Sequence, residues 1–161
     1  MNIKYEKMST IDITGAVILF RKLVEEASEV SFSEVENEKQ LLDWLQNPNY
    51  YLFVAKEDNE VVAVFRCSRG EGAKKHSGLL TIAVDPAYRG KHIASSFTLY
   101  CLEELKKSGI KLARAYIYSD NKPSINTILA CGFSVSGCVY QHHYNDKKGI
   151  YVDDIIFHKL L

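Results

Sequence analysis

The sequence predicts a single domain of the mixed α/β class, with one central β-sheet that contains parallel and antiparallel strands and is flanked by helices. Apolar residues recur at strand or helix spacing in the order β-α-α-β-β-β-α-β-α-β-β. Short turns join some neighbouring strands, which makes those pairs antiparallel, whereas crossover helices join others. A chain of 161 residues with no repeat or Pro/Gly/Ser-rich linker fits one domain over residues 1–161.

The first half of the chain is predicted to contain a strand over 2–8 and a helix over about 10–28, in which Gly15 weakens the first turn. The apolar residues at helical spacing are Ile13, Val17, Phe20, Val24 and Ala27. A polar, acidic connection over 31–37 leads to a short helix that Asn47-Pro48 ends. Strands over 51–56 and 61–67 follow, joined by a hairpin turn at Asp58-Asn59.

The second half begins with a charged loop over 69–75 and a nearly continuous apolar run over 79–84, which is typical of a central strand. The next helix ends near Ser108-Gly109 and has an apolar stripe formed by Ile93, Phe97, Cys101 and Leu105. A strand over 112–118 and a helix over about 122–131 follow. Strands over 133–140 and 151–157 are predicted to form a closing hairpin.

Composition and charge limit the function classes. Hydrophobic residues make up 47% of the chain, and 20 basic residues balance 20 acidic ones. A zero net charge argues against a general nucleic-acid or membrane-surface binder, which would carry a basic excess. The chain lacks a signal-peptide pattern, and no apolar stretch approaches the roughly 18–20 residues that span a bilayer. We therefore expect a cytoplasmic protein.

The cysteines and histidines do not indicate a metal site. The four cysteines, Cys67, Cys101, Cys131 and Cys138, have no metal-like spacing. Three of the four lie in apolar patterns typical of buried, reduced thiols. His142-His143, with His76 and His158, fit no standard zinc spacing, and adjacent residues on a strand face opposite ways. We expect no bound metal.

Residues 82–94 are the most informative segment. An apolar strand runs into Asp85-Pro86, and the basic turn Arg89-Gly90-Lys91 precedes a helix that begins at about His92. At such a helix start the backbone N–H groups point outward and the helix dipole favours negative charge. The segment predicts a cradle for an anion, with a phosphate-bearing cofactor as the expected guest. The alternative is an ordinary strand-to-helix turn with surface charges.

Two motifs in this order resemble those of the GCN5-related N-acetyltransferase (GNAT) family. Val84–Ala94 is similar to the family's acetyl-CoA loop, Arg/Gln-x-x-Gly-x-Gly/Ala after a strand. Asn121–Ser124, followed by Ala130–Phe133, is similar to its Asn-x-x-Ala/Ser helix closed by Gly-Phe, and Tyr151–Ile155 resembles a common last strand of its small-molecule members. The order of elements matches over nearly the whole chain. The resemblance implies a GNAT-like acyl-CoA N-acyltransferase fold and acetyl transfer from acetyl-CoA to an amine.

The resemblance also implies where acetyl-CoA binds. Main-chain amides from about Arg89 to Ser95 would hold the pyrophosphate, because Gly90 permits the turn and small residues let the backbone come close. The pantetheine arm would bond the backbone of Ile82 and Val84, with Asn121 beside it. For Asn121 a helix N-cap is the alternative, and the two roles can coexist. The expected cofactor-binding residues are Ile82, Ala83, Val84, Arg89, Gly90, Lys91, His92, Ile93, Ala94, Ser95, Asn121 and Ser124.

His92 departs from the family pattern, in which glycine is usual at this place. Its side chain would crowd the pyrophosphate, point to solvent, or reach a phosphate oxygen as a charged donor; the sequence leaves these open. The usual catalytic positions also depart from the pattern. Many members use a carboxylate on the fourth strand as base and a tyrosine seven residues after the helix asparagine as acid, and here these positions hold Gly78 and Ile128.

Catalysis would then rest on other groups. Holding the amine against the thioester supplies much of the acceleration, and a main-chain N–H near Ala83 or Val84 would stabilise the oxyanion. Water would carry the proton, or a side chain on the substrate side would do so. The candidate side chains, each with a packed or solvated role as its alternative, are Tyr118, Tyr140, Glu34 and Asp153.

The acceptor is expected to be a primary amine of a small molecule, an amino acid or a peptide N-terminus. An acidic stretch over 25–38 borders the acceptor pocket by the resemblance and would favour cationic amines; a solvated surface is its alternative. Two other functions remain open: a CoA-binding sensor or pseudoenzyme without catalysis, and an unrelated α/β interaction domain. The last hairpin would be exposed and is compatible with a homodimer.

Overall fold

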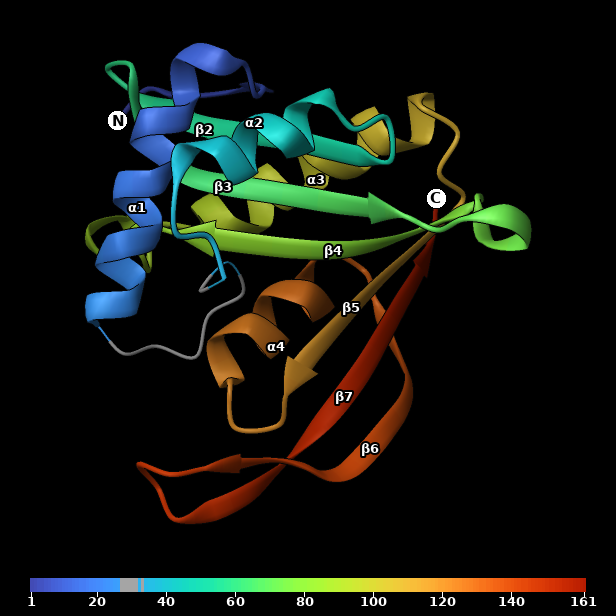
Figure 1. Cartoon of the computed structure of the whole chain (residues 1–161). Coiled ribbons are helices and arrows are strands. Elements are labelled where there is room, and N and C mark those ends of the chain that lie inside the picture. Colours follow the sequence, from blue (N-terminus) through green and yellow to red (C-terminus); the bar gives the residue numbers. More distant parts are fainter. Residues whose placement is uncertain (27–31, 33) are drawn as a thin grey trace.

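The computed structural model contains a seven-stranded sheet with helices on both faces, and it describes residues 1–26, 32 and 34–161 (Figure 1). The strand order is β1-β2-β3-β4-β5-β7-β6, and every neighbouring pair is antiparallel except β4 and β5. This arrangement confirms the predicted mixed sheet. The strands are β1 Ile3–Lys7, β2 Tyr50–Glu57, β3 Glu60–Arg69, β4 Ser77–Val84, β5 Leu112–Tyr118, β6 Ser134–Asn145 and β7 Ile150–Leu160.

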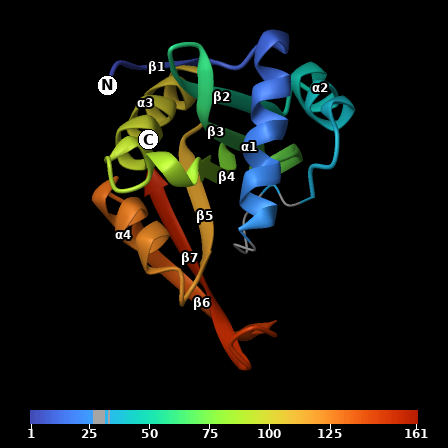
Figure 2. The same cartoon turned by 90° about the vertical axis from the view of Figure 1, so that its left-hand side faces the viewer.

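The helices lie in two layers, with α1 and α2 over one face of the sheet and α3 and α4 over the other (Figure 2). We call these the front face and the back face. Three short 3-10 turns, η1, η2 and η3, precede α1, β4 and α3 respectively. The helices are α1 Ile13–Glu25, α2 Glu38–Gln46, α3 Ile93–Lys107 and α4 Lys122–Ala130, and the turns are η1 Thr10–Asp12, η2 Gly72–Lys74 and η3 Pro86–Tyr88.

Strand alternation divides the core between the two faces. Val54, Val64 and Ala83 pack under α1 and α2 on the front face. The neighbouring Phe53, Phe65 and Leu80, together with the buried stripe of α3, form the core of the back face. The predicted stripe Ile93, Phe97, Cys101 and Leu105 is confirmed, because each of these side chains is buried.

Two element predictions need correction. Helix α1 turns Leu23 into the core and leaves Val24 half exposed, because Leu23 continues the row of Ala16 and Phe20 at helical spacing; the predicted Ala27 lies outside the described residues. The final hairpin is longer than predicted, since β6 and β7 extend to Asn145 and Leu160. Shifts in register along β6 accommodate the extra residues, and Gln141 takes a positive φ of 48° there.

Strands β4 and β5 pair only at their beginnings. Ser77, Gly78 and Leu79 lie beside Leu112, Ala113 and Arg114, and beyond these residues the two strands separate into a V (Figure 1). We call the space between Leu80–Val84 and Ala115–Tyr118 the β4–β5 opening. Because no strand of the described residues fills it, the backbone groups of β4 that face it are available to another molecule.

Candidate active site

The chain leaves β4 through a turn that α1 holds in place. The Asp85 carboxylate accepts a hydrogen bond from the N–H of Ala87 at 2.9 Å and lies 2.7 Å from Nζ of Lys22 on α1. Burial raises the pKa of Asp85, but the hydrogen bonds from Lys22 and Ala87 outweigh it, so the pKa lies below its ordinary value. A charged Asp85 therefore fixes the position of η3, which leads to the start of α3.

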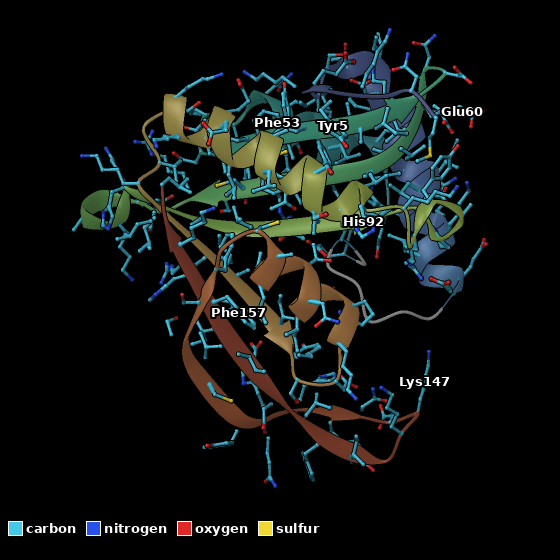
Figure 3. The ribbon with its side chains drawn as sticks, turned by 180° about the vertical axis from the view of Figure 1, so that it is seen from behind. Tyr5, Phe53, Glu60, His92, Lys147 and Phe157 are labelled. Carbon is cyan, nitrogen blue, oxygen red and sulfur yellow. The ribbon has the colours of Figure 1, made fainter. Side chains whose placement is uncertain are left out.

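The predicted anion cradle contains two residues in the left-handed conformation. Gly90 has a φ of 73° and His92 a φ of 60°. His92 is the N-cap residue of α3 and lies at the beginning of that helix (Figure 3). Glycine adopts this conformation without steric cost, which is the backbone reason that glycine suits position 92. Histidine keeps the same turn here, and its side chain is exposed to solvent.

The two helix starts near the opening differ in how they are capped. Asn121, as predicted for a cap, accepts a hydrogen bond from the N–H of Ser124 at 3.2 Å at the start of α4. His92 makes no side-chain cap within the described part of the chain. The first N–H groups of an α-helix have no partner inside the helix. The start of α3 therefore keeps the free amides that an anion needs, whereas Asn121 partly satisfies the start of α4.

The basic side chains of the cradle are already engaged. The Arg89 guanidinium contacts both carboxylate oxygens of Glu26, at 3.1 and 2.8 Å, at the end of α1. The Nζ atom of Lys91 lies 4.7 Å from the ring centre of Tyr88. The N–H of Arg89 donates to the carbonyl of Pro86 at 3.3 Å, so among the described residues the uncommitted main-chain amides of the cradle begin at Gly90.

The backbone of β4 alternates between its two edges. The N–H of Asp85 donates to the carbonyl of Val62, and the carbonyl of Ser77 accepts from Gly70, so these residues bond on the β3 side. Residues 78–84 pair with β3 without a shift in register. By alternation the backbone groups of Ile82 and Val84 face the β4–β5 opening, and those of Ala83 face β3. The two residues predicted to bond the pantetheine arm are those whose backbone is turned toward the opening.

The departures at positions 78 and 128 have packing causes. A Cβ atom on Gly78 would lie 2.2 Å from Sγ of the buried Cys67, so no side chain fits there. Gly78 alternates with Leu79 and therefore belongs to the back face, under α3. Ile128 is 7% exposed and packs in the same core. Neither position can place an ionisable group near the opening.

The four candidate catalytic side chains do not converge. Tyr140 is 80% exposed on β6, and the Asp153 carboxylate accepts from the N–H of Gln141 at 2.8 Å. Glu34 forms an ion pair with Nη1 of Arg66 at 3.1 Å. Tyr118 stacks on His143 with ring centres 4.8 Å apart. Tyr118 is on the front face, since it alternates with Ile117 of the back core, and Glu34 reaches that face through Arg66.

Asp154 was not predicted as a site residue from the sequence, and the structure places it beside Tyr118. It lies directly opposite Tyr118 across β5 and β7 and therefore shares the front face, whereas Asp153 points to the other face. Its Oδ1 is buried without a hydrogen-bond partner among the described residues, and its Oδ2 lies 4.0 Å from Nε2 of His142. Burial raises the pKa of Asp154. Side-chain alternation along β7 puts Asp153 and Asp154 on opposite faces, but only the register of β7 with β5 shows which of the two lies on the front face.

The predicted acidic border is partly neutralised. Glu26 and Glu34 pair with arginines, and Glu38 accepts a hydrogen bond from Thr14 at 2.8 Å. Glu25 and Glu36 line a hollow between α1 and the segment before α2, and Glu29 lies outside the described residues. These contacts weaken the case for a preference for cationic amines.

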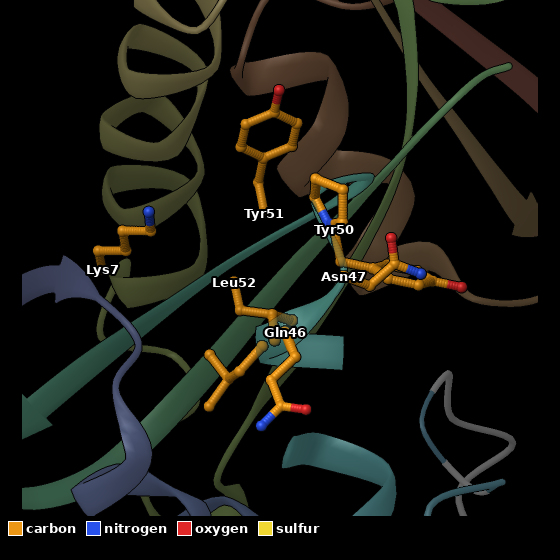
Figure 4. A pocket seen from close by; sticks show the side chains of 8 residues that line it. Lys7, Gln46, Asn47, Tyr50, Tyr51 and Leu52 are labelled. Carbon is orange, nitrogen blue, oxygen red and sulfur yellow. The ribbon is translucent and has the colours of Figure 1, made fainter. Parts of the chain in front are cut away.

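A second hollow lies between the end of α2 and the start of β2 (Figure 4). It is lined on one side by Lys7 of β1 and on the other by Gln46, Asn47 and Tyr50. The strand β3 separates it from β4, so it is not part of the opening.

In the described ranges, no three His, Cys, Asp or Glu side chains gather as metal ligands would. Among the helices of residues 1–26, 32 and 34–161, none has the length and apolarity needed to cross a bilayer. The four cysteines are free thiols, three of them buried, as predicted.

Besides its outer strands β1 and β6, the sheet has an open strand edge at β4, next to the uncapped start of α3, and this arrangement suits an extended molecule that ends in an anion. Comparison with protein families identifies it: the model of the acetyltransferase (GNAT) family matches residues 19–133. The chain therefore belongs to the GNAT family, whose enzyme class is N-acetyltransferase.

Curated relatives agree with this family. The chain is 24% identical over 131 residues to the putative phosphinothricin acetyltransferase YwnH of Bacillus subtilis, covering 78% of this chain and 80% of that protein. It is 21% identical over 103 residues to a mycothiol acetyltransferase of Nocardiopsis dassonvillei. That match covers 61% of this chain but only 31% of the relative, so the chain spans about a third of that protein.

Solved structures show the same fold. A ribosomal-protein-alanine N-acetyltransferase from Brucella melitensis has a TM-score of 0.85 at 21% identity, covering 98% of this chain and 99% of that one. The putative acetyltransferase yncA from Salmonella typhimurium, solved with its cofactor acetyl-CoA, has a TM-score of 0.86 at 18% identity, covering 99% and 94%. At these identities the likeness establishes the fold alone and does not identify the acceptor of this chain.

Proposed function

We propose that the chain is an acetyl-CoA-dependent N-acetyltransferase whose acceptor is a primary amine of a small molecule, an amino acid or a peptide N-terminus. The observation that carries the proposal is the β4–β5 opening, where the backbone of Ile82 and Val84 faces free space beside the uncapped start of α3. An extended amide-containing arm pairs with such an edge as an added strand does, and its phosphates reach the helix start.

The residues present fit acetyl-CoA. Apart from its chain neighbours, no described residue has an atom within 4 Å of where a Cβ of Gly90 would stand, so the turn leaves room for a phosphate. Asn121 and Ser124 flank the other side of the opening, at the start of α4. Acetyl-CoA supplies an activated thioester, from which a neutral amine takes the acetyl group as the thiolate leaves.

The protein's contribution to the chemistry is placement and charge stabilisation. The N–H groups of Ile82 and Val84 face the opening and are our candidate donors to the pantetheine arm and the thioester oxygen, in preference to the N–H of Ala83, which faces β3. Tyr118, Asp154 and water are the candidates for moving the proton of the amine. No residue at position 78 or 128 takes part, for the packing reasons given above.

The proposal is tested by the release of free thiol from acetyl-CoA with a panel of primary amines, together with binding of CoA. The variant Val84→Pro removes one N–H at the open edge without removing a bond to β3, and Val84→Ala keeps that N–H. Loss of one neutral hydrogen bond of about 0.5–1.5 kcal/mol predicts CoA binding about 2- to 12-fold weaker in Val84→Pro alone.

Two results would favour other functions. Tight CoA binding without acetylation of any amine in the panel would favour a CoA-binding sensor, the alternative that the missing base and acid positions suggest. If CoA does not raise the melting temperature at all, the chain is not a CoA-binding protein, because a ligand that binds the native state must stabilise it. A homodimer and a cytoplasmic location remain our predictions from the sequence.

A further inference from the structure

Arg66 is held on the front face in an unusual setting. It lies on β3, and its guanidinium carbon is 4.4 Å from the ring centre of Trp44 and 5.0 Å from that of Phe32. Nη1 is 3.1 Å from Glu34 and Nη2 is 3.4 Å from Oγ1 of Thr81. Nε is buried without a hydrogen-bond partner among the described residues. Two rings and two polar contacts fix this cation in one orientation while one of its donors stays unpaired.

A second arginine whose Nε is buried and unpaired among the described residues lies on a neighbouring part of the sheet. The Nε of Arg114 on β5 is also buried and unpaired within the described residues. Arg114 is opposite Leu79 in the last pair that joins β4 to β5, so it stands where the opening begins. Its strand neighbours Ala113 and Ala115 belong to the core of the back face, which puts Arg114 on the front face.

The register brings the two arginines to the same place. Arg66 is opposite Thr81, and Arg114 is opposite Leu79, two residues before Thr81 on the same face of β4. Residues opposite one another, and residues two apart on a strand, share a face. The two arginines therefore flank β4 on its front side, on strands about 10 Å apart. Two extended guanidinium side chains can meet one small anion across that distance.

Unpaired buried donors need an explanation. Most buried polar groups in proteins are hydrogen-bonded, and an unpaired donor costs more on a charged group than on a neutral one. A carboxylate has two acceptor oxygens, so one carboxylate can accept an N–H from each of the two guanidinium groups when both side chains turn toward it. The Glu34 carboxylate already pairs with Nη1 of Arg66 at 3.1 Å, so this cation binds a carboxylate in the protein itself.

We infer that Arg66 and Arg114 form an anion subsite for a carboxylate carried by the acceptor next to its amine. The acceptor is then an amino acid or a closely similar amino-carboxylate, and its amine reaches the β4–β5 opening beside Leu79 and Thr81. The inference rests on the proposed acetyltransferase function and narrows its acceptor: a free amine without a neighbouring anion, or a peptide N-terminus, lacks the group that the subsite binds.

The subsite is separate from the place proposed for the CoA phosphates. Arg114 is level with Leu79, and the phosphate cradle begins beyond Val84 at the other end of β4. At about 3.3 Å for each residue, the two places lie at least about 16 Å apart along the strand. Cofactor and acceptor would thus approach the opening from opposite ends of β4.

The test measures kcat/KM for thiol release from acetyl-CoA with matched acceptors. L-Methionine, L-phenylalanine and L-glutamate are each compared with the corresponding amine that lacks the α-carboxylate and with the α-amide. The proteins are the wild type, Arg114→Gln, Arg66→Gln and the control Lys39→Gln, which removes a cation from the exposed side of α2. Thermal unfolding shows whether each variant is folded, and CoA binding is measured for each.

The subsite predicts that, for at least one of the three amino acids, the wild type has a higher kcat/KM than for the corresponding amine without the α-carboxylate and for the corresponding α-amide. Arg114→Gln should lower kcat/KM for that amino acid, mainly through KM, about 12- to 150-fold more than for the decarboxylated amine, as expected for a charged hydrogen bond of about 1.5–3 kcal/mol. Arg66→Gln should do the same if it folds, and Lys39→Gln should not. Arg114 alone suffices for the test if Arg66→Gln does not fold.

Two failures are distinguishable. If the wild type binds CoA and acetylates amines without preferring any carboxylated acceptor, or if the arginine variants lose both kinds of acceptor equally, the subsite is wrong and the acetyltransferase function stands. If the wild type neither binds CoA nor releases thiol with any amine, the proposed function itself is wrong.

Discussion

Replacing His92 with glycine should stabilise the protein, because His92 is a non-glycine residue in the left-handed conformation at the start of α3. A residue with a Cβ pays roughly 1–2 kcal/mol in that conformation, and glycine avoids this cost. Glycine also loses about 0.4–1 kcal/mol more on folding, because its unfolded chain is freer. The difference predicts a net gain of about 0–1.6 kcal/mol, with a central value of ~0.8 kcal/mol, in the free energy of unfolding for His92→Gly.

For a chain of 161 residues the central value corresponds to a melting temperature about 1–4 °C higher. Thermal unfolding of His92→Gly, measured beside His92→Ala, checks this value. Alanine removes the imidazole but keeps the Cβ, so His92→Ala should show no gain. Gly90→Ala should lower stability, because the φ of Gly90 is 73° and, apart from its chain neighbours, no described residue lies within 4 Å of the added Cβ, so backbone strain alone would act.

The same variants decide what the imidazole does. Because the side chain of His92 is exposed and makes no cap within the described residues, His92→Gly should bind CoA as tightly as the wild type, within about twofold. A charged donor to a phosphate oxygen would instead be worth about 1.5–3 kcal/mol, and its loss would weaken binding more than about tenfold. A destabilised His92→Gly, or one no more stable than His92→Ala, would refute the strain argument.

Three further variants test other contacts. Gly78→Ala should lower the free energy of unfolding by about 1–3 kcal/mol, because its Cβ would lie 2.2 Å from Sγ of Cys67. Adding Cys67→Ala should restore most of that loss, as measured by denaturant unfolding. Lys22→Met leaves the buried Asp85 carboxylate without its cation and should lower the free energy of unfolding by about 1–3 kcal/mol at pH 7. The pKa of Asp85 is lowered in the native state, so the pair stabilises the protein above the unfolded pKa of about 4. The difference in stability between Lys22→Met and the wild type should therefore shrink as the pH falls below that value. Asp154→Asn should be more stable than the wild type at pH 7, because burial raises the pKa of Asp154 and so disfavours its charged form, and this gain should vanish in thermal unfolding below about pH 4.

The order of elements and the mixed sheet were predictable because helix and strand spacing differ strongly in this chain. The errors came from positions where spacing alone does not decide. Leu23 and Val24 are both apolar at the end of α1, and only packing against the sheet shows that Leu23 is the buried one. The length of the last hairpin depends on bulges in β6, for which the sequence has no clear signal.

The cofactor side of the site was more accessible to sequence reasoning than the acceptor side. The turn at Gly90 and the asparagine cap at Asn121 are local features with short motifs. The front face is instead assembled from residues far apart in the chain, and its make-up depends on register. A charged residue inside an otherwise apolar strand was a usable signal for Arg66 and Arg114, but only the pairing of β3, β4 and β5 shows that they flank one place.

The central claim is that acetyl-CoA lies in the β4–β5 opening. A crystal structure of the chain with acetyl-CoA tests it most directly. We predict that the pantetheine arm is hydrogen-bonded to the backbone of Ile82 and Val84 and that the pyrophosphate lies against the amides between Arg89 and Ser95. Acetyl-CoA bound elsewhere, with the edge of β4 and the start of α3 left free, would contradict the account.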